Sequence, residues 1–171
     1  SRELKARLIS VGDLVVREKL YSGYDEERKT YVADLSKVRE RIQELVRQSA
    51  EDVVIIEGHY AQLVAPDDVE MVVVLRCEPN ELERRLRKAG YSDEKVSENV
   101  RAEILDVCLC ESVERYGGSK IFEVNTTGKS PKDVVREVLV ALKEGVRRLG
   151  VVDWLGELDK KGELERFFNE L

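Results

Sequence analysis

Two side chains that can do chemistry, Glu57 and His59, directly follow an apolar run of the sequence. The run, Val53–Ile56, holds four branched residues without alternation, which predicts a strand buried on both faces of a parallel sheet. Ligands of such sheets bind beyond the carboxyl ends of the strands. A carboxylate and the only imidazole of the chain can project to the same side there. The pair therefore predicts a site, although the two groups could also merely cap the strand.

A cationic cluster forms the second candidate. Four cations occupy five positions of a predicted helix, at Arg84, Arg85, Arg87 and Lys88. Such a run is often a solvated helix face. Here it leads into the turn Gly90–Ser92, after which a helix resumes. This arrangement also fits a short lid that closes over phosphate groups.

A third candidate is the loop Asn125–Pro131, which follows the predicted strand Ile121–Val124. Thr127, Gly128 and Lys129 lie in this loop, and a helix is predicted to begin after it. Exposed backbone amides, a glycine and a lysine before a helix can hold a nucleotide. A simple strand-to-helix connection explains the same residues nearly as well, so both interpretations stay open.

The N-terminal part offers an acid and a group of tyrosines. Asp13 either caps the predicted helix Leu14–Leu20 or contacts a ligand. Tyr21, Tyr24 and Tyr31 fall within eleven positions of one another. A tyrosine ring has a flat apolar face and a polar tip, which suits stacking on a base and equally suits a loop on the protein surface.

The elements that must position these residues alternate between strands and helices. Strands are predicted at Ile9–Val11, Val53–Ile56, Met71–Leu75 and Ile121–Val124. Helices are predicted over Ser1–Leu8 and Leu14–Leu20, from Asp34, from Glu78, and over Ser92–Gly117 and Ser130–Arg148, with a polar loop at Tyr21–Arg28. This alternation predicts an α/β three-layer domain with a parallel sheet.

Composition narrows the classes of protein. With 171 residues the chain is long enough for one domain with a real core. Its net charge of -6 argues against a general nucleic-acid-binding surface, although it allows a local basic pocket for phosphates. No apolar run reaches the roughly 20 residues that span a bilayer, and no signal peptide is recognisable at the start. We therefore expect a cytoplasmic protein without a membrane partner.

The three cysteines support the same expectation. Cys77, Cys108 and Cys110 are an odd number without a set of ligand-like partners, which favours reduced thiols. Cys108 and Cys110 could suggest a metal, but a Cys-x-Cys pair in a helix points to two different faces. Packing in the core is the favoured interpretation of both.

Motifs distributed over nearly the whole chain resemble one family. They are Val11–Leu14, Leu20–Glu27, Glu57–His59, Val74–Arg76, Arg85–Ser92 with Lys95, Glu98–Val100, Glu103–Ile104 and Asn125–Pro131. The family is the archaeal and eukaryotic nuclear-type adenylate kinases that also act in maturation of the small ribosomal subunit. The most specific piece is the segment Gly90–Val100.

The resemblance implies a P-loop kinase fold that transfers a phosphoryl group from ATP to AMP, with Mg²⁺ as the cofactor. It implies a nucleoside monophosphate kinase-like domain at residues 1–149, with the nucleotide-acceptor part at about 13–48 and the lid at about 88–98. Residues 150–171 are expected to form a small helical C-terminal appendage.

The resemblance also implies roles for particular residues. Glu57 takes the place of an acid, usually aspartate in the family, that holds the metal through water, and His59 matches the histidine of the same element. The family lid opens with an arginine directly before Gly-Tyr, where this chain has Ala89. The remaining implied residues are the catalytic cations Arg85, Arg87 and Lys88; Thr127, Gly128 and Lys129 at the adenine of ATP; Lys95 as a further nucleotide contact; and Asp13 and Tyr24, within Tyr21–Asp34, on the AMP side.

The phosphate-binding loop of this fold is missing from the printed sequence. No Gly-x-x-x-x-Gly-Lys-Ser/Thr occurs, and Gly117–Lys120 is the nearest fragment, with the wrong spacing. In the family the strand before that loop lies in the middle of the sheet, so its loss would leave unpaired backbone groups at two inner edges. We expect the natural protein to carry this strand and loop upstream of Ser1. The alternative is a degenerate kinase fold that serves as a binding module.

Three functions therefore compete. The first is adenylate kinase activity. The second is an assembly factor that binds a small-subunit ribosomal protein, uS11, and uses ATP as a release switch, and the two can coexist. The third is a kinase for another small molecule on the same fold.

Overall fold

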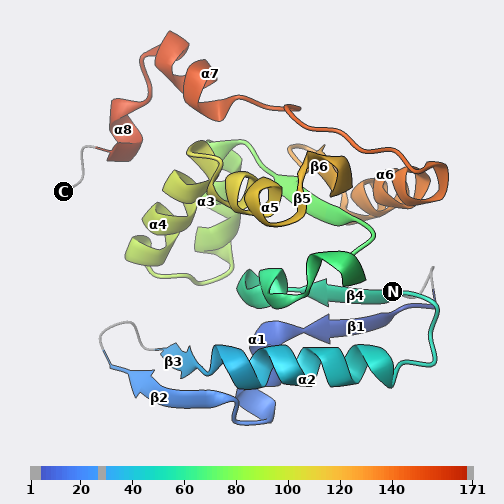
Figure 1. Cartoon of the computed structure of the whole chain (residues 1–171). Coiled ribbons are helices and arrows are strands. Elements are labelled where there is room, and N and C mark those ends of the chain that lie inside the picture. The colour runs from blue at the N-terminus through green and yellow to red at the C-terminus, as the bar shows by residue number, and fades with distance from the viewer. Residues whose placement is uncertain (1–4, 27–29, 169–171) are drawn as a thin grey trace. The chain divides into compact units, whose positions relative to one another are not determined.

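The computed structural model of the chain describes residues 5–26 and 30–168 (Figure 1). The chain divides into two compact units, residues 1–68 and 69–171. Both units combine a parallel pair of strands with helices, and this confirms the predicted α/β class. Within the described residues, no helix is long and apolar enough to cross a membrane.

The first unit is built on a parallel pair formed by β1 (Arg7–Ser10) and β4 (Val54–Glu57). In this pair Leu8 lies opposite Ile55 and Ser10 lies opposite Glu57. The other elements of the unit are α1 (Val11–Arg17), the antiparallel hairpin of β2 (Tyr21–Asp25) and β3 (Thr30–Ala33), α2 (Leu35–Arg47), and the 3-10 turns η1 (His59–Leu63) and η2 (Pro66–Asp68).

Helix α2 begins where the sequence predicts it, because Asp34 caps it. The Asp34 carboxylate accepts a hydrogen bond from the Lys37 backbone N–H at 3.2 Å. The buried side chains Val38, Ile42 and Leu45 recur at helical spacing on one face of α2. The Arg7 guanidinium donates to the Leu45 carbonyl at 2.9 Å, which ties β1 to the end of α2.

Three predictions about the first unit are wrong in part. Arg7 and Leu8 lie in β1 and not in a helix, while residues 1–4 are outside the described ranges. The helix predicted at Leu14–Leu20 begins at Val11, so Ser10 is its N-cap and Asp13 lies in its first turn. The predicted loop after it is the β2–β3 hairpin, because the tyrosines have a high preference for strands.

The second unit is built on β5 (Val72–Arg76) and β6 (Ile121–Asn125), which pair in parallel with Val74 opposite Glu123 and Arg76 opposite Asn125. Its helices are α3 (Pro79–Lys88), α4 (Asp93–Ile104), α5 (Val107–Tyr116), the 3-10 turn η3 (Gly118–Lys120), α6 (Pro131–Glu144), α7 (Trp154–Lys161) and α8 (Glu165–Phe168).

Two apolar clusters hold this unit together. In one, Phe122 and Val124 of β6 pack with Ala141 of α6. In the other, Val96, Val100 and Ile104 of α4 pack with Leu158 and Phe167 of the C-terminal helices. Leu82 and Leu86 of α3 are packed against this second cluster. The C-terminal helices and the α3–α4 hairpin therefore share one core.

Two predicted helices of this unit end earlier than expected. The helix predicted over Ser92–Gly117 is broken at Asp106, which has a left-handed backbone with φ of 57°. The helix predicted to reach Arg148 ends at Glu144, where Gly145 supplies the left-handed C-cap. Arg148 instead bridges to Phe122, and its backbone N–H donates to the Ile121 carbonyl at 3.0 Å.

Two predictions of burial are also wrong. The strand at Val53–Ile56 is only half-buried, and Leu75 of β5 is 59% exposed. β6 also pairs with one neighbour only, yet it is almost wholly buried because Phe122 and Val124 pack with Ala141 of α6, so burial here depends on which elements cover a strand. Cys108 and Cys110 are exposed and therefore do not belong to the core, whereas Cys77 is buried.

Candidate active site

The end of β4 is shaped by a glycine. Gly58 has a φ of 121°, which side chains rarely tolerate, and an added Cβ would lie 3.6 Å from Cβ of Val11. The turn at Gly58 therefore brings the carboxyl end of β4 against the first residues of α1. Glu57, the last residue of β4, is exposed, and its carboxylate makes no hydrogen bond to any other residue that the structure describes. His59 begins η1 with its backbone, but its side chain lies outside the described part of the chain.

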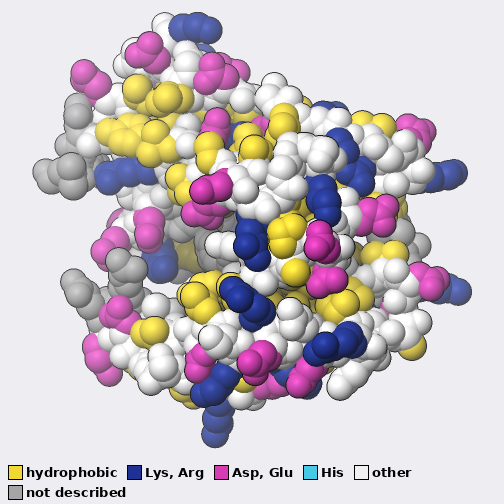
Figure 2. Space-filling view, in the orientation of Figure 1, with side chains coloured by type: hydrophobic (Ala, Val, Ile, Leu, Met, Phe, Trp, Pro, Cys, Tyr) yellow, Lys and Arg dark blue, Asp and Glu magenta, His cyan; other side chains and the backbone are white. Residues whose placement is uncertain are grey.

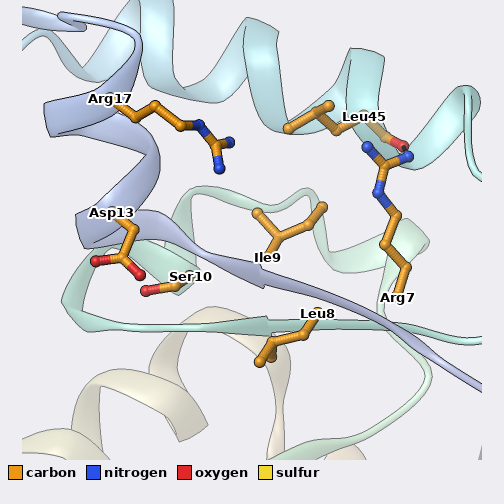
Figure 3. A pocket seen from close by; sticks show the side chains of 7 residues that line it. All are labelled: Arg7, Leu8, Ile9, Ser10, Asp13, Arg17 and Leu45. Carbon is orange, nitrogen blue, oxygen red and sulfur yellow. Dashed lines mark hydrogen bonds between the residues drawn. The ribbon is translucent and has the colours of Figure 1, made fainter. Parts of the chain in front are cut away.

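Asp13 lines a cavity of about 310 Å³ in the first unit (Figure 3). The lining side chains come from β1, α1 and α2, and they are Arg7, Leu8, Ile9, Ser10, Asp13, Arg17 and Leu45. In Figure 3 the Asp13 carboxylate lies beside Ser10, and the Arg17 guanidinium points into the space between α1 and α2. A carboxylate, a hydroxyl and two guanidinium groups line this cavity together with the aliphatic side chains of Leu8, Ile9 and Leu45.

The three tyrosines of the hairpin contact one another. The rings of Tyr21 and Tyr31 are stacked with centroids 4.2 Å apart, and Tyr24 meets Tyr31 edge-on at 5.1 Å. The side chain of Tyr24 is 46% exposed. Base stacking and a surface role for the ring of Tyr24 both remain compatible with this arrangement.

The predicted catalytic cations lie in the second unit, and two of them are held by acids. Arg87 pairs with Glu83 at 3.1 Å and also with Asp93, so it closes the turn between α3 and α4. Arg85 is held by Glu81 and by the loop after β6, as described next. Lys88 is exposed and has no ion pair with any residue in the described ranges.

The loop after β6 is held from several sides. Thr126 is buried, and both its N–H, at 2.7 Å, and its hydroxyl, at 2.8 Å, donate to the Arg76 carbonyl. Arg85 donates to the Thr126 carbonyl at 3.0 Å. The hydroxyl of Thr127 accepts the Glu78 backbone N–H at 2.9 Å. The loop that the resemblance places at the adenine is therefore fixed to the ends of β5 and α3.

Gly128 and Lys129 complete this loop, and each contacts an acid. The Gly128 N–H donates to Glu81 at 3.2 Å. The Lys129 ammonium donates to Glu137 of α6 at 2.7 Å, and this bond lowers the pKa of the Glu137 carboxyl. Burial raises the pKa of Glu78, but hydrogen bonds from the Asn80 side chain and nearby backbone N–H groups outweigh it, so that pKa is lowered.

Lys95 lies in the first turn of α4, where its side chain is exposed. Its backbone N–H donates to the hydroxyl of Ser92 at 3.4 Å, and Ser92 is the N-cap of α4. The predicted start of a helix after Gly90–Ser92 is confirmed, and Asp93 of this first turn also pairs with Arg87.

A buried charge cluster surrounds Arg76, and the sequence pattern did not predict it. The Arg76 side chain is 1% exposed and donates to Glu103 at 2.9 Å, to Glu123 at 2.5 Å and to Asp106. Burial by itself would lower the pKa of Arg76, but the carboxylates of Glu103 and Asp106 outweigh it and raise that pKa. Trp154 also donates to Glu103, at 2.8 Å. The available signal was Glu123, an acid inside the apolar run of a strand.

The arrangement fits a magnesium ion held through water. No group of three or more possible metal ligands occurs among the described residues. Magnesium in phosphate-transferring sites is usually held by one or two carboxylates, the phosphates and water, and needs no such group. The exposed carboxylate of Glu57, without a protein partner in the described chain, suits that outer contact.

Comparison with known proteins identifies the family. A family model described as an AAA domain matches residues 1–106, and the chain belongs to this family. Its fold is thus an α/β P-loop kinase-like fold.

Three archaeal relatives cover most of the chain, and each bears the name "Putative adenylate kinase". That of Methanocaldococcus jannaschii is 40% identical over 151 residues, or 88% of this chain and 80% of the relative. That of Thermococcus onnurineus is 38% identical over 94% of this chain and 83% of the relative. That of Methanosarcina acetivorans is 37% identical over 87% of this chain and 84% of the relative. The printed name agrees with the family that the sequence motifs resemble.

Proposed function

We propose that this protein is an adenylate kinase that converts ATP and AMP into two ADP with Mg²⁺. The observation that carries the proposal is the exposed Glu57 carboxylate at the end of a parallel strand, before the turn at Gly58. This is the place where α/β proteins bind ligands. The adenylate kinase name of the archaeal relatives supports the same reaction.

In this proposal the protein mainly positions two nucleotides and neutralises the charge that develops during phosphoryl transfer. Bound magnesium would supply charge neutralisation at the phosphates, and Glu57 would hold it through water. We assign His59 to the same site because it follows Glu57 by two residues in the sequence. Lys88 and Lys95, which are exposed, are suited to phosphate contacts. Thr127–Lys129 would contact adenine, and Asp13 and Tyr24 the AMP side.

The test is a coupled assay of ADP formation from ATP and AMP, made with the natural gene product and its native amino terminus. Glu57→Ala should lower kcat by about 10–100-fold, the loss typical of outer-shell metal contacts. Glu144→Ala, at an exposed acid of α6, is the matched control and should leave kcat unchanged. His59→Ala should lower turnover more than it lowers stability. No turnover by the unmodified protein would contradict the proposal.

We further propose a role in maturation of the small ribosomal subunit, with the ribosomal protein uS11 as partner. The observation that favours it is the segment Gly90–Val100, the most specific motif of the family that the sequence resembles. A pull-down with purified uS11 and with small subunits tests it. Retention of either, released by ATP, supports the role, and binding of neither contradicts it.

A further inference from the structure

Two side chains of α3 form a bridge to the loop between β6 and α6. The Arg85 guanidinium donates to the Thr126 carbonyl at 3.0 Å and to the Thr126 hydroxyl at 3.2 Å. One turn earlier on α3, Glu81 accepts the Gly128 N–H at 3.2 Å. Glu81 and Arg85 are also paired with each other. The pair therefore binds this loop at two points, because Arg85 donates to Thr126 and Glu81 accepts from Gly128.

Other bonds hold the loop without this pair. The Thr126 N–H donates to the Arg76 carbonyl at 2.7 Å, and the Glu78 N–H donates to the Thr127 hydroxyl at 2.9 Å. The Thr127 N–H donates to the Asn125 side chain at 2.9 Å. The loop should therefore keep its overall path when Arg85 is removed, and lose only the fine placement of its outer backbone.

The outer side of the loop is open. Gly128 is exposed, has a φ of 66°, and an added Cβ there would meet nothing within 4 Å. A flat ligand such as a base therefore has room to approach the backbone at this residue. Thr126, in contrast, is buried beneath it and bound to β5.

We propose that Arg85 and Glu81 are positioning residues that set the base selectivity of the Thr126–Gly128 loop. This inference rests on the proposed function, in which that loop contacts adenine. Arg85 then acts through the loop backbone and is not a phosphate ligand. Adenine presents a donor at N6 where guanine presents an acceptor at O6. A site built to hydrogen-bond one pattern discriminates strongly only while its polar groups stay in place.

The experiment uses the natural gene product and measures kcat, KM and the affinity for fluorescent ATP and GTP analogues. Arg85→Ala and Glu81→Ala should raise KM for ATP by about tenfold and reduce the preference for ATP over GTP by about tenfold. They should change kcat at saturation by no more than about threefold. Arg85→Lys should restore part of the preference, because an ammonium can still donate to the Thr126 carbonyl.

Lys143→Ala is the control, since Lys143 is an exposed cation of α6, outside the candidate sites, without a bond to any described residue. It should leave all values unchanged. A loss of kcat in Arg85→Ala with unchanged KM and base preference would make Arg85 a phosphate ligand and overturn the inference. Unchanged kinetics in both variants would overturn it as well. Absence of nucleotide binding and turnover in the unmodified protein would overturn the proposed function and this inference together.

Discussion

The two parallel strand pairs of this protein end in opposite ways. In the first unit β4 is half-buried and ends in the exposed Glu57, whose side chain has no partner in the described chain. In the second unit β6 is almost wholly buried, and β5 ends in Arg76, which three acids hold. Polar groups at one strand end are thus available to a ligand, whereas those at the other hold the protein together.

Burial explains this difference. A guanidinium that is 1% exposed has lost nearly all contact with water, so it persists only where carboxylates replace that water. Glu123, which is also fully buried, gains Arg76 and the backbone N–H of Val151 as donors. Glu57 is exposed to solvent and therefore needs no such partner. A buried glutamate, Glu123, therefore stabilises the second unit, whereas an exposed glutamate, Glu57, is accessible to a ligand in the first.

Charges elsewhere on the surface are mixed in sign. On the face shown in Figure 2, Lys and Arg side chains alternate with Asp and Glu and do not gather into one basic patch.

The largest expected effect comes from Arg76→Met. It leaves Glu123 and Glu103 without their counter-charge, so the free energy of unfolding should fall by about 3–5 kcal/mol. Glu57→Ala, at the other strand end, should change it by less than about 0.5 kcal/mol. Urea unfolding followed by circular dichroism measures both. Equal losses in the two variants would break the comparison between the strand ends.

Gly58→Ala should have the next largest effect. The φ of 121° is strained for any side chain, while the new Cβ would meet Val11 only at an ordinary contact distance. We expect a loss of about 2 kcal/mol in thermal or urea unfolding. Gly12→Ala is the control, because a Cβ there meets nothing within 4 Å and no positive φ is involved. A Gly58→Ala protein as stable as the unmodified protein would show that the turn relaxes easily.

Trp154→Phe tests how much the Trp154 N–H contributes to the buried charge cluster around Arg76. The exchange keeps most of the apolar ring and removes only the N–H that donates to Glu103 at 2.8 Å. The loss should be about 1–2 kcal/mol, as for a hydrogen bond to a charged group. If Glu103 is already satisfied by Arg76 and the Cys77 N–H, the melting temperature will not move, and the indole then adds only packing.

The smallest expected effect is on the stability of the protein at low pH. Glu137 and Glu18 have lowered pKa values, mainly through hydrogen bonds from Lys129 and Arg41, respectively. A lowered folded-state pKa contributes stability above the unfolded pKa, and that stability is lost as pH falls through the folded value. Stability should therefore decrease below about pH 4. Glu137→Gln should make the decrease shallower, while Glu94→Gln, at an exposed acid, should not; urea midpoints at pH 7 and pH 3.5 measure this.

Several local features could be predicted from the sequence. The strands Val54–Glu57, Val72–Arg76 and Ile121–Asn125 lie where apolar runs occur. The caps Asp34, Glu78, Ser92 and Ser130 begin helices where they were predicted to do so. These features depend on neighbours within a few residues, so their physics is present in the local sequence. The assignments of Glu57, His59 and the nucleotide contacts stay predictions.

Tertiary structure alone decided the rest. The long predicted helix breaks at Asp106, and the carboxylate of this residue binds Arg76, 30 residues away in sequence. Arg85 donates to the carbonyl of Thr126, which is 41 residues away, and its predicted role as a catalytic cation stays a prediction. A sequence pattern reveals which residues carry charge and where helices begin, but the partner of a buried or half-buried charge depends on which distant strand and helix ends meet.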